Sequence, residues 1–352
     1  MKRMFTFLGM VLATYLAGST AATATEYPLP PAGSRLIGEN IAYPVPHDGR
    51  PLEAIASDFK IGLLNMLEAN PGTDPYLPTP GSTLTVPTQM LLPDTPREGI
   101  VVNLAELRLY YFPNGKNTVF VFPIGIGQQG RNTPSMVTSV SEKRANPTWT
   151  PTANIRKRYL EEEGIKLPAV VPAGPDNPMG LHALRLAAHG GVYLLHGTNA
   201  NFGIGMRVSS GCIRLRADDI EWLFNNVPVG TRVQIINDAV KTSLEPDGKR
   251  YIEVHQPLSK SPKDDPQTMA LPLNKQIQSF IHAAETDSQM VADAIVRRSG
   301  MPILVSAGQS VEHFQEPVIT APETHQAAPI SSISYHSDLT VRRVLEPLSA
   351  NE

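Results

Sequence analysis

Proline is the feature that most constrains how this chain can fold. The sequence contains 33 prolines in 352 residues, nearly twice the usual share. Because proline fixes φ and lacks a backbone N–H, we expect many loops and stiff linkers between short elements. A chain of this length predicts two or three domains, and its 41% hydrophobic content is enough for a substantial core.

The N-terminus has the pattern of a secretory signal peptide. Lys2 and Arg3 precede an apolar run at 4–17, and Ala22-Thr23-Ala24 has the form of a cleavage site. The run is too short to span a bilayer well, so residues 1–24 predict export without stable membrane insertion after cleavage. A membrane-anchored N-terminal helix is the alternative. The net charge of −3 does not indicate a nucleic-acid partner or an anionic membrane surface.

Residues 40–88 are expected to form a small α+β domain. Two strands, at 41–45 and 83–86, bracket two helices at 51–59 and 61–68, and Asn70-Pro71-Gly72 signals a turn. This order and these residues resemble a LysM domain. The resemblance implies binding to the glycan of peptidoglycan, and a small structural cap is the alternative.

Residues 97–237 are expected to form a mostly β domain. Strands are predicted at 100–104, 108–112, 119–123, 181–186, 192–196 and 231–236. Asn114-Gly115 predicts a hairpin between the second and third of them. The stretch 133–178 is expected to be irregular, and 217–224 to be a helix capped by Asp218.

The remaining sequence predicts a small α+β extension at 238–306 followed by a disordered tail at 307–352. The extension is expected to contain strands at 251–254 and 301–305. Its helices are predicted at 276–284 and 288–298, with Asp287 as the cap of the second. From residue 307 onward the chain is polar and proline-bearing with weak periodicity.

Cys212 is the only cysteine in the chain. An unpaired thiol in an exported protein is a candidate reactive group, and a buried, inert cysteine is the alternative. His196 lies 16 residues earlier, and glycines at 203, 205 and 211 allow the intervening loop to turn tightly. A histidine within hydrogen-bond reach can take the thiol proton and lower the thiol pKa. The pattern predicts a Cys–His acyl-transfer site.

Neighbouring residues offer the other parts of such a site. The Gly197 carbonyl can accept from Nδ1 of His196 and hold the useful tautomer. The backbone N–H groups of Ser210 and Gly211, next to that of Cys212, can form an oxyanion hole, worth about 2.7–4 kcal/mol per donor. If a strand continues past the thiol, Arg214 and Arg216 share its face and can bind a substrate carboxylate.

The same residues resemble a known signature. The region resembles the motif of YkuD-type L,D-transpeptidases in three features. They are the stretch His196-Gly-Thr-Asn199, the 16-residue spacing and the stretch Ser209-Ser-Gly-Cys-Ile-Arg214. Pro147-Thr-Trp149-Thr-Pro151 and Asn177-Pro-Met-Gly180 also match, and the resemblance covers about residues 97–236. The family usually has a histidine directly before Gly-Cys, where this chain has Ser210.

The resemblance implies a two-step reaction that uses neither metal nor cofactor. Cys212 would attack the bond between meso-diaminopimelate and D-Ala in a peptidoglycan tetrapeptide stem, and an amine would then attack the thioester. His196 would act as base and then as acid. Asn199 and Trp149 are further candidate substrate-binding residues.

The LysM-like front and the C-terminal extension resemble the subgroup that attaches Braun-type lipoprotein to peptidoglycan. This implies a lipoprotein lysine as acceptor and the periplasm as location. Formation of 3–3 crosslinks, hydrolysis of the thioester and non-catalytic wall binding are the alternatives. A metal site at His182, His189 and His196 is disfavoured, because Gly190-Gly191 breaks the helix that would align them.

Overall fold

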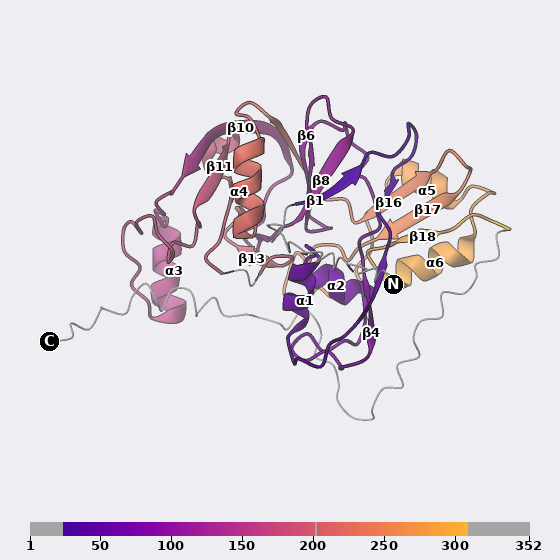
Figure 1. Cartoon of the computed structure of the whole chain (residues 1–352), viewed down its shortest axis with the longest axis horizontal. Coiled ribbons are helices and arrows are strands. Elements are labelled where there is room, and N and C mark those ends of the chain that lie inside the picture. Colours follow the sequence, from indigo (N-terminus) through magenta and orange to yellow (C-terminus); the bar gives the residue numbers. More distant parts are fainter. Residues whose placement is uncertain (1–23, 201–202, 309–352) are drawn as a thin grey trace, which may run out of the picture.

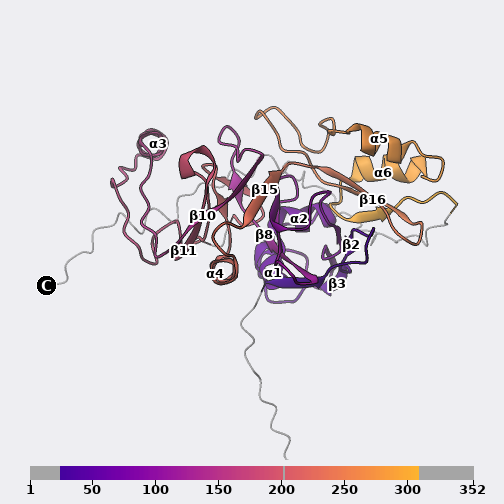
Figure 2. The same ribbon diagram turned by 90° about the horizontal axis from the view of Figure 1, so that it is seen from above.

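The computed structural model describes residues 24–200 and 203–308. The predicted signal peptide, apart from Ala24, and the predicted tail from residue 309 onward therefore lie outside the described residues. Two views at right angles show the C-terminal helices at the opposite end of the molecule from helix α3, with the main sheet and the N-terminal helices between them (Figures 1 and 2). Within the described ranges, no helix is long and apolar enough to cross a membrane.

Nine strands of the described chain form one curled sheet in the order β1-β8-β7-β6-β15-β10-β11-β12-β14. Neighbours are antiparallel except β6 with β15 and β12 with β14, which run parallel. The mostly β fold is confirmed. The strands are β1 (Thr25–Pro28), β6 (Gly99–Asn103), β7 (Arg108–Phe112), β8 (Thr118–Pro123), β10 (Met136–Ala145), β11 (His182–Leu186), β12 (Leu194–His196), β14 (Ile213–Arg214) and β15 (Arg232–Ile236).

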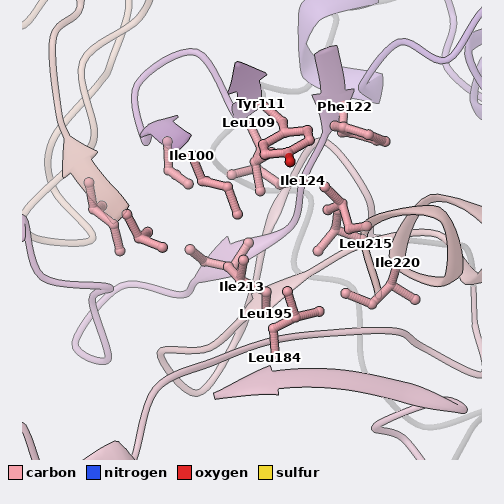
Figure 3. Packing of buried hydrophobic residues seen from close by; sticks show 14 of the residues in the cluster. Ile100, Leu109, Tyr111, Phe122, Ile124, Leu184, Leu195, Ile213, Leu215 and Ile220 are labelled. Carbon is pink, nitrogen blue, oxygen red and sulfur yellow. The ribbon is translucent and has the colours of Figure 1, made fainter. Parts of the chain in front are cut away.

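The main core lies inside the curl of this sheet. Figure 3 shows Ile100, Leu109 and Phe122 from β6–β8 facing Leu184, Leu195 and Ile213 from β11, β12 and β14. Helix α4 (Ala217–Asn226) closes this core with Ile220 and Leu223. The turn at 114–115 joins β7 and β8, and the predicted hairpin is confirmed by their antiparallel pairing.

The stretch 133–178 is more regular than expected. It contains the ten-residue strand β10 and helix α3 (Ala153–Glu163). Helix α3 is polar on most of its surface, so it lacks the apolar periodicity by which helices are recognised. The Thr152 hydroxyl accepts from the Ile155 N–H and begins the helix, and Gly164 ends it at φ 69°.

The N-cap of helix α4 lies two residues earlier than predicted. Its N-cap is Arg216, whose side chain makes no cap hydrogen bond, and Asp218 lies in the first turn. The expectation that Asp218 caps this helix was wrong, because its carboxylate forms an ion pair with Lys60 of the N-terminal unit instead.

The N-terminal unit, residues 40–88, has the expected strand–helix–helix–strand order. It consists of β3 (Ile41–Pro44), α1 (Leu52–Asp58), α2 (Leu63–Ala69) and β4 (Thr83–Val86), with β3 and β4 antiparallel. A small sheet of β2 (Leu36–Ile37) and β5 (Met90–Leu91) flanks it. Strand β1 pairs with β8 of the main sheet, and nothing in the sequence pattern indicates this pairing.

The C-terminal part contains a three-stranded antiparallel sheet covered by two helices. Its elements are β16 (Val240–Leu244), β17 (Arg250–Val254), α5 (Lys275–Ile281), α6 (Ser288–Arg297) and β18 (Pro302–Leu304). The Asp287 side chain accepts from the N–H groups of Gln289 and Met290, which confirms the predicted cap of α6. Strand β16 was not predicted.

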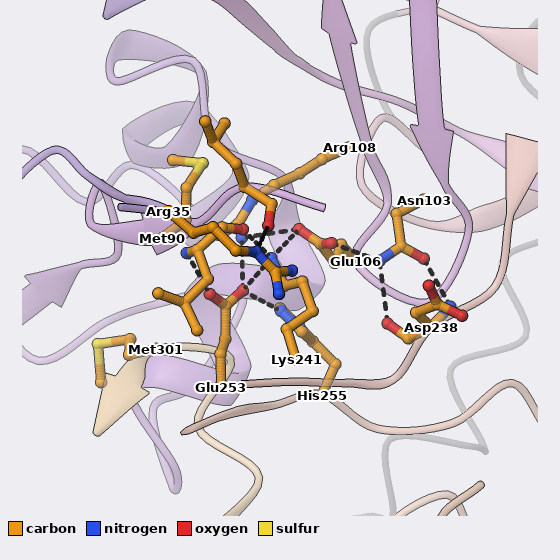
Figure 4. A network of polar contacts seen from close by, with 12 residues as sticks. Arg35, Met90, Asn103, Glu106, Arg108, Asp238, Lys241, Glu253, His255 and Met301 are labelled. Atoms are coloured by element: carbon orange, nitrogen blue, oxygen red, sulfur yellow. Dashed lines mark hydrogen bonds and ion pairs between the residues drawn. The ribbon is translucent and has the colours of Figure 1, made fainter. Parts of the chain in front are cut away.

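A buried network of charges joins these parts (Figure 4). The Lys241 ammonium lies 3.0 Å from Oε2 of Glu106 and 2.9 Å from Oε1 of Glu253. His255 donates from one ring nitrogen to Glu253, at 2.8 Å, and from the other to Glu68 of α2, at 2.9 Å. Burial disfavours the charged ring, but the two carboxylates outweigh it and raise the pKa of His255 to about 9.

Candidate active site

His196 and Cys212 lie on neighbouring strands at the end of the main sheet: β12 ends with His196, and Cys212 directly precedes β14. The two strands pair in parallel, with Leu195 opposite Ile213 and His196 opposite Arg214. Leu195 and Ile213 are buried in the core, so His196 and Arg214 point to the opposite face of the sheet. Cys212, which directly precedes Ile213, is half-buried, and its sulfur lies 3.8 Å from the Val192 carbonyl.

The imidazole of His196 is held in one tautomer. Its Nδ1 lies 2.6 Å from the Gly197 carbonyl oxygen. Because a carbonyl can only accept, Nδ1 carries the hydrogen and the lone pair of the neutral ring is on Nε2. Burial lowers the pKa of His196 to about 4, and the nearby Arg214 charge acts in the same direction. The ring is therefore neutral at physiological pH.

The thiol is also neutral at rest. Burial raises the pKa of Cys212 above its ordinary value of 9.0, against the opposing effects of a backbone hydrogen bond and Arg214. The groups that lower the thiol pKa here are the Leu194 backbone and Arg214, and an effect of His196 on the thiol stays a prediction. Burial of the imidazole and partial burial of the thiol favour the neutral form of each group over the charged form.

Two hydroxyl groups hold the loop that carries Cys212. Ser209 Oγ accepts from the Gly211 N–H at 3.1 Å and donates to the Cys212 carbonyl at 2.5 Å. Thr133 Oγ1 donates to the Gly211 carbonyl at 2.9 Å and accepts from the Gly127 N–H at 3.1 Å. The Gly211 amide is thus already paired. It does not fit the oxyanion role expected for it, whereas Ser210 is exposed beside it.

A second set of contacts holds the loop after His196. Gly180 has φ +66°, and a Cβ there would lie 2.8 Å from the Thr198 nitrogen and 2.9 Å from the Gly197 carbonyl carbon. Only glycine permits this approach. The Asn177 side chain donates to the Pro147 carbonyl at 2.9 Å and accepts from the Met179 N–H at 2.8 Å. The Asn177-to-Gly180 motif therefore shapes the backbone around the imidazole.

Asn199, Trp149 and Arg214 were also predicted to bind substrate, and each has different surroundings. Asn199 is half-buried and donates to the Asp176 carbonyl at 3.1 Å. Trp149 packs beside α3 in a small cluster with Tyr159 and Leu167. Arg214 is half-buried, and burial lowers its pKa while the phenol of Tyr159 opposes that shift. Arg214 is thus the cation whose charge acts on both His196 and Cys212.

Arg216 does not lie where the sequence placed it. Strand β14 ends at Arg214, so the alternation of faces does not continue to Arg216. The Arg216 side chain is 2% exposed and donates to the Ile61 carbonyl of the N-terminal unit at 3.0 Å. Arg216 contacts another part of the protein instead of a substrate surface.

Sequence reasoning missed Thr133 because it falls in the stretch expected to be irregular. Nothing in the local pattern indicates that its hydroxyl bonds a residue 78 positions away. The sequence also gave no indication of Tyr193, whose ring lies 3.2 Å from the point where a Cβ on Gly211 would be. Both residues shape the thiol loop through contacts that only the folded chain creates.

One group of side chains in the described chain has the spacing of metal ligands. It consists of Glu106, Glu253 and His255, whose donor atoms lie within 4.8 Å of one another. The ammonium of Lys241 contacts both carboxylates of this group. A cation of the protein itself therefore occupies the position, and the group does not fit a metal ion.

Comparisons with known proteins match two parts of this chain to described families. Residues 97–235 match the L,D-transpeptidase catalytic domain family YkuD, and residues 239–305 match the L,D-transpeptidase C-terminal domain family. The chain is 62% identical over 310 residues to the protein named probable L,D-transpeptidase YcfS of Escherichia coli, covering 88% of this chain and 96% of the relative.

Two further relatives from Escherichia coli cover most of the chain. The one named probable L,D-transpeptidase ErfK/SrfK is 55% identical over 83% of this chain and 94% of its own length. The one named probable L,D-transpeptidase YbiS is 53% identical over 81% of this chain and 93% of its own length. This chain belongs to the L,D-transpeptidase family and is an L,D-transpeptidase.

Proposed function

We propose that this enzyme transfers an acyl group through a thioester on Cys212, with His196 as the general base. The observation that carries the proposal is the hydrogen bond from His196 Nδ1 to the Gly197 carbonyl. It leaves the Nε2 lone pair as the proton acceptor, on a ring next to the strand end that carries the thiol. Because both groups are neutral at rest, the thiol proton passes to Nε2 before or during the attack.

In the first step the Cys212 sulfur attacks the carbonyl carbon at the L-centre of diaminopimelate in a tetrapeptide stem. The thiol proton passes to Nε2 of His196, and a tetrahedral oxyanion forms. The bond to the D-Ala nitrogen then breaks, and the imidazolium returns the proton to the leaving amine. The products are free D-Ala and a thioester between the tripeptide stem and the enzyme.

In the second step an amine attacks the thioester carbonyl. His196 takes a proton from the amine, an amide bond forms, and the sulfur leaves and recovers its proton through the imidazolium. Water in place of the amine would release the tripeptide. The chemistry at Cys212 is the same in both cases, so the acceptor determines the product.

The surrounding residues suggest how the reacting groups are held. Because the Gly211 amide is paired with Ser209, we assign the oxyanion to the backbone N–H groups of Ser210 and Cys212. The Arg214 guanidinium is the cation near the sulfur and is suited to a stem-peptide carboxylate. Asn199 and Trp149 remain proposed substrate contacts, and Arg216 is not among them.

We assign the lysine of an outer-membrane lipoprotein as the acceptor and the periplasm as the location. The support is the resemblance of the motifs and domain order to lipoprotein-attaching enzymes. A C-terminal part that matches the L,D-transpeptidase C-terminal domain adds to it. The LysM-like fold of residues 40–88 supports binding to the peptidoglycan glycan. The predicted signal peptide at 1–24 supports export.

The test is a reaction with two competing acceptors. The enzyme is incubated with a disaccharide-tetrapeptide and a peptide ending in lysine, and the products are identified by mass spectrometry. The proposal predicts a lysine-linked tripeptide product and release of D-Ala, both lost in Cys212→Ala. A 3–3 dimer or free tripeptide as the main product would contradict the lipoprotein assignment, and turnover by Cys212→Ala would contradict the nucleophile.

A further inference from the structure

The segment that leads to Cys212 is pressed against the N-terminal unit. The Leu64 N–H donates to the Gly205 carbonyl at 3.3 Å. The backbones cross so closely that a Cβ on Gly205 would lie 2.3 Å from Gly62 Cα, and a Cβ on Gly62 would lie 2.8 Å from Gly205 Cα. On its other side the Gly205 N–H donates to the Ile124 carbonyl of the catalytic part at 3.0 Å. The segment is therefore held between two parts of the protein.

The next residue, Met206, belongs to the core of the N-terminal unit. Its side chain is 7% exposed and packs with buried residues of α1, α2 and β4 and the loops around them, while the partly buried Val208 packs against the same cluster. The other buried members of this cluster are Val45, Leu52, Ile55, Ala56, Ile61, Leu63, Met66, Leu67, Leu84 and Val86. The N-terminal core is thus completed by a side chain that lies six residues before the thiol.

The chain that follows Cys212 contacts the same unit. Arg216 donates to the Ile61 carbonyl at 3.0 Å. Lys60 forms ion pairs with Asp218 and with the buried carboxylate of Asp219, the latter at 3.3 Å. The connection between α1 and α2 therefore holds the chain on both sides of the thiol.

The far side of the unit is fixed as well. Glu68 of α2 accepts from His255 and from the Gln256 N–H, at 2.9 and 3.0 Å. The Arg297 guanidinium donates to the Glu68 carbonyl at 2.7 Å. A module that only recruits substrate needs no such contacts. These contacts instead make the unit a rigid support between the C-terminal part and the thiol loop.

We propose that the N-terminal unit is a structural part of the active site, with Met206 and Arg216 as positioning residues for Cys212. The proposal rests on the proposed role of Cys212 as nucleophile. The unit acts on the reaction by fixing both ends of the thiol loop, in addition to any binding of glycan. A displacement of the loop by about 1 Å is expected to slow the chemical step by up to a hundredfold.

The first test inserts a methyl group between the two backbones. Gly62 has φ −80°, which alanine adopts without strain, so Gly62→Ala pushes on Gly205 without straining its own backbone. Gly49→Ala is the matched control: it lies in the same unit at φ +71°, where alanine is strained, but nothing lies within 4 Å of its Cβ. The control therefore destabilises the unit without touching the loop.

Two measurements are made on each full-length variant. One is the second-order rate of Cys212 acylation by a carbapenem, followed by intact-protein mass spectrometry. The other is amide hydrogen exchange over residues 203–216. We expect Gly62→Ala to lower the acylation rate tenfold to a hundredfold and to speed exchange in the loop, and Gly49→Ala to change the rate by less than twofold.

Met206 provides a second comparison that does not depend on Gly62→Ala folding. Met206→Ala should slow acylation and loosen the loop, and Met206→Leu, which refills the volume, should restore both to within about twofold of the unchanged protein. Equal acylation and exchange in Met206→Ala and the unchanged protein would overturn the positioning role. Failure of the unchanged protein to acylate at Cys212 would count against the proposed function, while loop exchange would still decide the positioning.

Discussion

Replacing Lys241 by methionine is expected to destabilise the protein strongly, because its ammonium is the cation between two buried carboxylates. Glu106 and Glu253 are each within 3.0 Å of it and none of the three is exposed by more than 3%. Arg108 lies farther away, at 3.4 Å from Glu106 and 3.3 Å from Glu253. In Lys241→Met, Glu106 loses its closest cation, and Glu253 keeps only His255, at 2.8 Å, and the more distant Arg108, while both carboxylates remain buried.

The magnitude follows from that uncompensated charge. Removing one partner of a buried ion pair costs about 3–5 kcal/mol in the free energy of unfolding. A loss of 1 kcal/mol in the free energy of unfolding lowers the melting temperature of a unit of about 150–250 residues by about 2–4 °C. The melting temperature of Lys241→Met should therefore fall by roughly 6–20 °C. Urea unfolding at pH 7, followed by far-UV circular dichroism, measures the change.

Two further variants make the result decisive. Lys249→Met in the same β16–β17 hairpin removes an exposed lysine that pairs with Asp247, and it should leave the unfolding midpoint unchanged. Glu106→Gln added to Lys241→Met restores the charge balance and should recover part of the loss. A Lys241→Met protein as stable as Lys249→Met would refute the reasoning.

Three other expectations concern pH and backbone geometry. The pKa of His255 is about 9 in the folded protein and about 6.5 when unfolded, so its stabilising effect is present below pH 6.5 and is lost as the pH rises through 9. The free energy of unfolding should fall over that interval, and less so in His255→Gln; parallel curves for the two proteins would exclude this linkage. The rate of Cys212 alkylation by iodoacetamide should keep rising with pH beyond 9, whereas a fast plateau between pH 5 and 8 would indicate a thiolate–imidazolium pair. Gly180→Ala should cost about 1–3 kcal/mol of stability and lower kcat, because its Cβ would meet the backbone beside His196; an unchanged kcat in a folded variant would argue against that role.

The parts of the fold that depend on local pattern could be read from the sequence. The Asn114-Gly115 turn predicted the β7–β8 hairpin, and Asp287 predicted the start of α6. Helix α3 and strand β10 were missed because their apolar residues follow neither period clearly. Their positions are set by pairing with distant strands and by capping.

The candidate active site, like the fold, could be predicted from the sequence only in part. The spacing of His196 and Cys212 and the Gly197 carbonyl identified the groups that the fold brings to one end of the sheet. Their protonation could not be read from spacing, because it depends on burial. Arg216 was misplaced because a strand was assumed to continue past Arg214, where the chain turns toward the N-terminal unit instead.

The most direct test of the central claim is to trap the acyl-enzyme. The protein is mixed with a disaccharide-tetrapeptide in the absence of any amine acceptor, quenched in acid within seconds and weighed intact. Acyl transfer through Cys212 predicts a mass gain equal to the disaccharide-tripeptide acyl group, located on Cys212 and absent from Cys212→Ala. Release of D-Ala by Cys212→Ala at the rate of the unchanged protein, with no adduct on either, would contradict it.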